Sequence, residues 1–311
     1  MQIVDAHHHF WDLQRNYHPW LRDEPMIPFR YGDYSSIRKN YLPDDLQRDA
    51  QGFEIIASVY VEAEWDPSDP IGETAWIHQI AASHGLPCGV VAQAWLDAPD
   101  AEQVLAAQAA FALVRSVRHK PRSAPSPDAA RRGQPGSMDD ERWRRGFARL
   151  QGLGLHFDLQ TPWWHLDAAA QLAADFPGTR IILNHTGLPA DRSDDGLSRW
   201  RTALERLANH RNTCIKISGI GLPGLEWTVE RNGPVVRDAI AIFGVERAMF
   251  ASNFPVDSVI GSYHQIFDGF LRIVSDLPDV DRQRLFCDNA LEIYRLTPRT
   301  RQTRTDFCTR I

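Results

Sequence analysis

Short runs of β-forming residues alternate with longer helical patterns along almost the whole chain, and this alternation constrains the fold more than any other feature. A repeated strand-then-helix pattern is typical of parallel sheets, in which helices cover both faces. We expect eight strands, over residues 2–6, 54–61, 88–95, 113–118, 155–160, 180–184, 214–218 and 248–252. Eight such units predict a closed (β/α)8 barrel, the TIM-barrel fold, because an open doubly wound sheet usually has fewer strands.

The helical patterns between and after these strands fit the same architecture. They cover residues 70–84, 101–112, 139–153, 166–176, 197–209, 234–243, 262–277 and 281–294. We therefore expect one barrel domain over residues 1–296, with an insertion after the first strand at 11–43 and a second one at 120–136. Residues 297–311 are rich in Arg and Thr and have little apolar periodicity. We expect a C-terminal extension there, or a contact between copies of the chain in a homo-oligomer.

Charge and hydropathy restrict the partners. The formal net charge is −6 and the two signs are interspersed, which argues against nucleic acid or an anionic membrane as the main partner and favours a small-molecule substrate. No apolar run approaches the roughly 20 residues of a membrane span, and the first residues lack the basic-then-apolar order of a signal peptide. We expect a cytoplasmic protein.

Three histidines follow the first apolar run, at the end of the first predicted strand. Side chains alternate faces along a strand, so Asp5, His7 and His9 should point the same way while His8 points the other way. Imidazole suits both a divalent metal and a hydrogen bond to a developing oxyanion. A tag or a solvated loop is the alternative, but the strand that precedes the histidines and the lack of a longer histidine run favour a functional site.

A further histidine closes the sixth predicted strand. His185 has the same parity as Ile181 and Leu183, so it should face the barrel interior, and it precedes the turn at Gly187. Active sites of barrel enzymes lie at the carboxyl ends of the strands, which places His185 with the first-strand histidines. The alternative is a core histidine whose hydrogen bonds are satisfied.

Other strands also end in polar side chains. Glu62, after the second strand, could serve as a base or metal ligand, or only as a helix cap or a solvated charge. Arg118 closes the fourth strand with a guanidinium fork suited to a substrate carboxylate. Gln160 and Trp163 follow the fifth strand and could hydrogen-bond to and stack on a polar ring, although they could equally be barrel packing. The first insertion is expected to form part of the pocket wall, with Trp11 as a candidate substrate contact; its aromatic residues are Trp11, Tyr17, Trp20, Phe29, Tyr31 and Tyr34.

The order of these motifs resembles the amidohydrolase-2 family. The matching segments are Asp5-Ala6-His7-His8-His9-Phe10-Trp11-Asp12, Asn184-His185-Thr186-Gly187-Leu188-Pro189, Lys216-Ile217-Ser218-Gly219 and Ser252-Asn253-Phe254-Pro255. The resemblance spans about residues 2–296 and is closest to a branch of lactone hydrolases, which includes sugar-acid lactonases and the pyrone-dicarboxylate lactonase.

The resemblance implies roles for the histidines. In relatives, the residues at the positions of His7, His9 and His185 bind a divalent metal such as Zn or Mn, or polarise the lactone carbonyl without a metal. Both alternatives stay open at this point.

One position departs from the family pattern. The eighth strand usually supplies an aspartate that activates the attacking water, but this chain has Asn253, and a neutral amide cannot take a proton from water as a carboxylate does. Asn253 could still orient a water or donate to an oxyanion. Glu62, Asp257 and a neutral His185 are the alternative bases. Glu62 is preferred because it closes a strand, whereas Asp257 lies past Pro255, where it could point out of the barrel. Asp257 is also a candidate substrate contact.

The resemblance implies hydrolysis of a lactone ring in a polar sugar-acid or dicarboxylate substrate, by direct attack of water at the histidine-lined barrel mouth. A metal-dependent decarboxylase of an aromatic or unsaturated acid is an alternative from the same family. A barrel that binds a small molecule without turning it over is a third hypothesis, which Asn253 makes conceivable.

Overall fold

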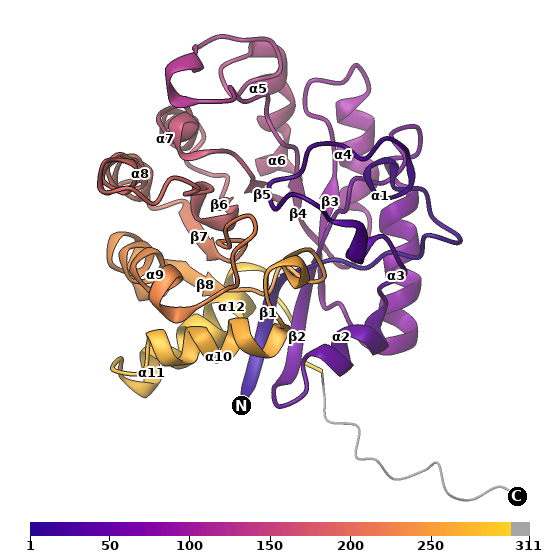
Figure 1. Cartoon of the computed structure of the whole chain (residues 1–311). Coiled ribbons are helices and arrows are strands. Elements are labelled where there is room, and N and C mark those ends of the chain that lie inside the picture. Colours follow the sequence, from indigo (N-terminus) through magenta and orange to yellow (C-terminus); the bar gives the residue numbers. More distant parts are fainter. Residues whose placement is uncertain (300–311) are drawn as a thin grey trace, which may run out of the picture.

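The computed structural model describes residues 1–299, in which eight parallel strands follow one another in chain order around a barrel (Figure 1). They are β1 (Gln2–His8), β2 (Glu54–Val61), β3 (Gly89–Gln93), β4 (Val114–Arg118), β5 (His156–Leu159), β6 (Ile181–Leu183), β7 (Thr213–Ile217) and β8 (Ala248–Phe250). The predicted (β/α)8 barrel is therefore confirmed. Every residue of β3 and β7 is buried, as expected for strands that are covered on both faces.

Helices surround the strands (Figure 1). They are α1 (Pro19–Arg22), α2 (Pro43–Asp49), α3 (Gly72–His84), α4 (Ala101–Ala109), α5 (Glu141–Phe147), α6 (Arg149–Gly152), α7 (Leu166–Asp175), α8 (Asp194–Ala208), α9 (Val229–Phe243), α10 (Tyr263–Ile273), α11 (Asp279–Gln283) and α12 (Asn289–Ile293). The two longest, α8 and α9, turn an apolar stripe inward; in α8, Trp200, Leu204 and Leu207 are fully buried.

One helix begins earlier than its apolar pattern suggests. The pattern predicts a start at Pro234, but α9 begins at Val229, because the Thr228 hydroxyl accepts a hydrogen bond from the Arg231 N–H and caps the helix. Pro234 then lies inside the helix, where its ring removes one backbone hydrogen bond.

The last strand returns to the first one. The Asn253 N–H donates to the His7 carbonyl at 2.8 Å, and the His9 N–H donates to the Phe254 carbonyl at 2.7 Å. The Ser252 N–H donates to the Asp5 carboxylate at 2.9 Å. These bonds complete the barrel and place Asn253 beside the first-strand histidines.

The two insertions are attached to the barrel. In the first one, the Trp20 indole N–H donates to the Ala63 carbonyl at 2.9 Å, and Arg30 donates to the Gly219 carbonyl at 2.9 Å, so the segment reaches from β2 across to β7. In the second one, Ala124 accepts a hydrogen bond from the Trp164 indole at 3.0 Å. Within residues 1–299, no helix has the length and apolar character needed to cross a bilayer. Most of the predicted extension at 297–311 lies outside the described residues, which end at 299.

Candidate active site

Three histidine rings lie together inside the barrel mouth. The centroid of the His7 ring is 5.0 Å from that of His9 and 4.7 Å from that of His185. All three side chains are buried. His8 turns away from them and packs on Phe10, with its Nε2 at 2.9 Å from the Ser58 hydroxyl. The alternation predicted for His7, His8 and His9 therefore agrees with the structure.

Asp5 does not follow that alternation. A register shift between Asp5 and His8 marks a bulge in β1, and the Asp5 carboxylate accepts hydrogen bonds from the hydroxyls of Ser252 at 2.6 Å and Tyr263, on α10, at 3.1 Å. The carboxylate nearest in sequence to the histidines is thus engaged in closing the barrel.

Hydrogen bonds distinguish the three rings. His9 Nδ1 lies 2.7 Å from the Val61 carbonyl, which can only accept, so Nδ1 carries the proton and Nε2 keeps a lone pair when the ring is neutral. His185 Nδ1 lies 3.0 Å from the Ser218 hydroxyl, which can donate or accept. Neither ring nitrogen of His7 has a hydrogen-bond partner among residues 1–299. His7 is therefore the ring that is free to meet a ligand.

Burial keeps the three imidazoles neutral. Desolvation lowers the pKa of His7, His9 and His185 well below the ordinary histidine value. Nearby guanidinium groups lower it further, that of Arg118 for His9 and that of Arg30 for His185. At neutral pH the cluster consists of uncharged rings, which can each donate one hydrogen bond.

The cluster does not form a preorganised metal site. Among the described residues 1–299, no group of three or more His, Cys, Asp or Glu side chains is arranged to hold a metal ion. Asp5 is bound elsewhere and position 253 is an asparagine, so neither brings a free carboxylate to His7, and an ion there would depend on the three imidazoles. The residues as they stand fit a Zn or Mn ion poorly, and no chemical step below is routed through a metal.

Glu62, Arg118 and Gln160, all predicted as site residues, meet at one wall of the mouth. Arg118 Nε forms a short ion pair with Glu62 Oε1, and both side chains are buried. The other Glu62 oxygen accepts the Glu64 N–H at 2.8 Å, and Arg118 Nη1 donates to Gln160 at 3.0 Å. Both carboxylate oxygens of Glu62 are therefore occupied, and part of the Arg118 fork is already used within the protein.

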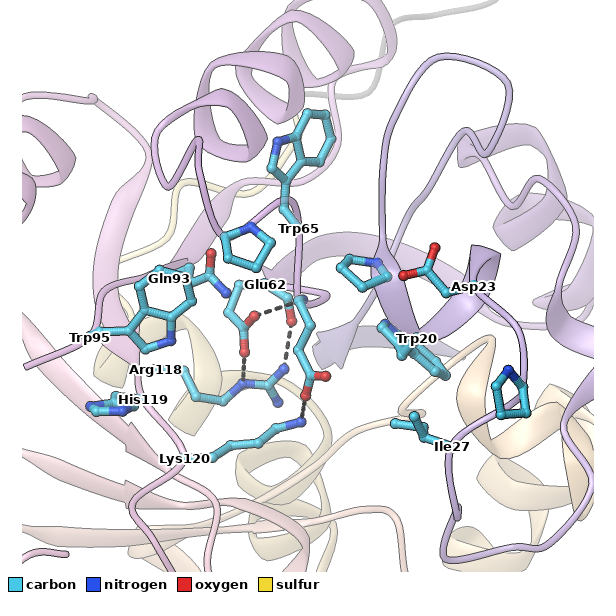
Figure 2. A pocket seen from close by; sticks show the side chains of 14 residues that line it. Trp20, Asp23, Ile27, Glu62, Trp65, Gln93, Trp95, Arg118, His119 and Lys120 are labelled. Atoms are coloured by element: carbon cyan, nitrogen blue, oxygen red, sulfur yellow. Dashed lines mark hydrogen bonds and ion pairs between the residues drawn. The ribbon is translucent and has the colours of Figure 1, made fainter. Parts of the chain in front are cut away.

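A cavity of about 400 Å³ opens beside this wall. In Figure 2, Trp20, Trp65 and Trp95 surround a floor that is crossed by the Glu62–Arg118 ion pair. A second ion pair of the cavity lining joins Lys120 to Glu64. The lining residues are Pro19, Trp20, Asp23, Pro25, Ile27, Glu62, Glu64, Trp65, Pro67, Gln93, Trp95, Arg118, His119 and Lys120. The first insertion and the loops after β2, β3 and β4 thus build one pocket with aromatic walls and a charged floor.

Two predicted aromatic wall residues lie elsewhere. Trp11 is fully buried, and its indole donates to the Lys39 carbonyl at 2.7 Å, so it packs beneath the first insertion. Trp163 lies beside Trp164, and the Arg199 guanidinium lies over its ring at 5.3 Å. Trp20, Trp65 and Trp95 occupy the wall instead, because the loop path rather than sequence proximity to a strand end decides which rings face the pocket.

Asn253 and Asp257 lie together on the β8 side of the mouth. Asn253 Nδ2 donates to Asp257 Oδ1 at 2.6 Å, and the Tyr31 hydroxyl donates to the same oxygen at 3.0 Å. Arg30 lies 3.6 Å from that oxygen. Asp257 is buried, although its position past Pro255 suggested that it could point out of the barrel.

Sequence reasoning assigned no role to several residues of this site. Lys216 is fully buried, and its ammonium group lies 2.7 Å from Asp158. A lysine within an apolar strand could have indicated such a buried ion pair. Ser218 belongs to a family motif, but its contact with His185 was not predicted. Tyr31 was noted only among the aromatic residues of the first insertion, and Arg30 gave no signal, because its place depends on how the insertion folds back over the barrel.

Comparison with known proteins agrees with this architecture. Residues 4–296 match the amidohydrolase family. The chain is 40% identical to an uncharacterized protein, y4mH, of Sinorhizobium fredii over 94% of this chain and 98% of the relative. It is 27% identical to an L-fucono-1,5-lactonase of Burkholderia multivorans, over 94% and 96% of the two chains. An amidohydrolase from Burkholderia multivorans, solved with bound Zn, superposes with a TM-score of 0.75 at 26% identity, over 96% of this chain and all of that one. The chain belongs to the amidohydrolase family.

Proposed function

We propose that this protein is a lactonase that opens the ring of a polar sugar-acid or dicarboxylate lactone by direct attack of water. The observation that carries the proposal is the cluster of three buried, neutral imidazoles around His7, whose two ring nitrogens have no partner among residues 1–299. The likeness to an L-fucono-1,5-lactonase supports the reaction class.

The imidazoles have complementary tasks in this reaction. A lactone carbonyl oxygen becomes negatively charged when water attacks, and a preorganised N–H donor stabilises that charge in a dry site. His7 is free to donate, and His185 can donate through Nε2 if the Ser218 hydroxyl donates to its Nδ1. His9 donates its Nδ1 proton to the Val61 carbonyl, so only the lone pair on Nε2 is left to meet a ligand.

The adjoining cavity suits a polar ring. Tryptophan faces stack on the C–H faces of a saturated ring, while charged and amide groups hydrogen-bond to its substituents. Trp20, Trp65 and Trp95 supply the first feature, and the floor with Gln93 and Lys120 supplies the second. Arg118 keeps guanidinium N–H groups beyond those it gives to Glu62 and Gln160, which could hold a substrate carboxylate or hydroxyl.

The test is acid release from a panel of sugar-acid and dicarboxylate lactones, measured together with carbon dioxide release from aromatic and unsaturated acids. We expect ring opening without carbon dioxide. In the His7→Ala variant, kcat should fall by on the order of a hundredfold or more, the usual effect of losing an oxyanion donor. His264→Ala, on the exposed face of α10, is the matched control and should leave kcat unchanged. Carbon dioxide release, or full activity of His7→Ala, would contradict the proposal.

A further inference from the structure

The asparagine at the end of β8 is bound to a carboxylate one helical turn further along the chain. Asn253 is fixed beside His7 by its backbone N–H and has a left-handed backbone, with φ of 57°. Its amide Nδ2 points to Asp257 Oδ1 at 2.6 Å. Asp257 lies in the short 3-10 turn Val256–Val259, which begins directly after Pro255. The carboxylate absent from position 253 is thus replaced by one in contact with that position.

Asp257 has one occupied and one free oxygen. Oδ1 accepts hydrogen bonds from Asn253 and Tyr31, and Arg30 lies near it. Oδ2 is buried and has no hydrogen-bond partner among residues 1–299. A buried carboxylate oxygen without a donor is costly unless a ligand or a water meets it.

The rival carboxylates are engaged or turned away. Both oxygens of Glu62 accept hydrogen bonds, from Arg118 and from the Glu64 N–H. Glu73 also has an oxygen without a partner in the part of the chain that the structure describes, but its other oxygen is bound by Tyr60, whose ring packs near His8 on the outer face of the barrel wall.

The Asp257 carboxylate lies on the same wall of the mouth as His185. Arg30 approaches Asp257 and also donates to the Gly219 carbonyl. A methyl group placed on Gly219 would lie 2.5 Å from His185 Nδ1 and 2.7 Å from Arg30 Nη2, so Gly219 lets the histidine and the guanidinium come close together. Arg30 therefore contacts both Asp257 and Gly219, and Gly219 packs against His185, so the guanidinium links the carboxylate to the histidine cluster.

We propose that Asp257 is the general base of the lactonase reaction and takes over the role that a β8 aspartate would have. This inference rests on the proposed function. Asp257 Oδ2 accepts a proton from water while the water oxygen bonds to the lactone carbonyl carbon. When the ring C–O bond breaks, the protonated Asp257 returns that proton to the departing ring oxygen. Water is added across the ester bond, the product is a hydroxy acid, and Asp257 is regenerated.

The groups that face Asp257 determine its titration. Burial raises the pKa of Asp257 to about 6, against the opposing effects of Arg30 and of the hydrogen bonds from Asn253 and Tyr31. Below that pH the base is protonated, so kcat/KM of the wild type should fall by about tenfold per pH unit, as for a single essential base. Arg30→Gln should move this acid limb to higher pH, because the positive charge that favours the carboxylate is gone.

The decisive variants are Asp257→Asn and the double variant Asn253→Asp with Asp257→Asn. In the single variant, kcat should fall by roughly 10² to 10⁴, the usual contribution of a general base, and the acid limb should vanish. The double variant returns a carboxylate to the end of β8 and should recover part of kcat with an acid limb of its own. Asp276→Asn, at an exposed carboxylate that pairs with Arg237, is the matched control. Circular dichroism and the melting temperature check folding.

The outcomes separate the two proposals. A wild type that opens no lactone overturns both. A wild type that opens lactones, with an equally active Asp257→Asn or with an unchanged acid limb in that variant, overturns the base assignment and leaves the lactonase intact. If Asp257→Asn does not fold, the wild-type and Arg30→Gln pH profiles decide: no acid limb near pH 6, or no shift on losing Arg30, refutes the assignment.

Discussion

At the scale of single residues, the chemistry of the site depends on which side chains are uncharged. His7, His9 and His185 are neutral because burial penalises their charged form. Asn253 is a neutral amide and brings no anionic ligand to the histidines. Because position 253 is an asparagine, Asp257 is the carboxylate on the β8 side. Asn253 donates a hydrogen bond to that carboxylate, and Arg30 lies beside it.

This donor set leads us to expect activity without a bound metal ion. We expect the purified protein to keep its lactonase activity after dialysis against a chelator and to contain metal well below one equivalent by elemental analysis. Added Zn or Mn should give no further rate. Loss of activity on chelation, with recovery on adding one equivalent of Zn, would show that the imidazoles rearrange around an ion.

Residues that end strands could be predicted, and residues on long loops could not. The carboxyl ends of the strands predicted where His7, His9, Glu62 and Arg118 lie, whereas His185 lies past β6 in a turn with a left-handed backbone, which strand parity does not describe. Arg30 reaches the site through a contact with Gly219, far away in sequence, and no local pattern encodes such a contact. Asp257 was underrated because the direction of the turn after Pro255 cannot be read from the order of residues.

At the scale of elements, α3 is joined to the end of β2 by a buried carboxyl group. Glu73, in the first turn of α3, accepts hydrogen bonds from the Tyr60 hydroxyl at 2.7 Å and from the Ala63 N–H at 2.6 Å. Burial and the charge of Glu62 raise the pKa of Glu73 from 4.5 to about 8. The folded protein therefore keeps a proton on Glu73 that the unfolded chain loses near pH 4.5.

This proton makes stability depend on pH. Between about pH 4.5 and 8 the folded state binds the proton and the unfolded state does not, so the free energy of unfolding falls as pH rises. The slope from one proton is at most about 1.4 kcal/mol per pH unit. Glu73→Gln, neutral at every pH, should flatten this slope in urea unfolding measured from pH 5 to 8. Glu205→Gln, exposed on α8, should not, and an unaltered slope in Glu73→Gln would refute the assignment.

The sequence predicted the types and order of the main helices and strands, but not where several helices begin or end. All eight strands were predicted because short β-rich runs between helices have few alternative structures, and the predicted range of β2 agrees with the observed one. Helix ends depend on caps such as Thr228, and the pattern at 139–153 breaks into α5 and α6 at Ala148. Hydrophobic periodicity reports burial of a face and says little about such breaks.

At the scale of the whole molecule, the two ends of the described chain close the barrel. β1 is bonded to the residues after β8, and Tyr294, just past α12, donates to the buried Asp158 carboxylate at 2.9 Å. Lys216 pairs with the same carboxylate, and its ammonium group lies 4.9 Å from the Tyr294 ring centroid. Tyr294 thus adds a hydroxyl donor to an ion pair that lies in the barrel interior.

The position of Tyr294 sets where the chain can be shortened. We propose that the barrel domain ends near residue 296, so a chain ending at Arg299 should melt at the same temperature as the full chain and open lactones at the same rate. A chain ending at Ile293 loses the fully buried Tyr294 ring together with its hydroxyl, so it should melt at a lower temperature; the lost donor to Asp158 alone costs about 1–3 kcal/mol. Thermal unfolding and light scattering of the three chains test this together. A lower melting temperature for the chain that ends at Arg299 would contradict the boundary, and a change in its mass would identify residues 300–311 as a contact between copies.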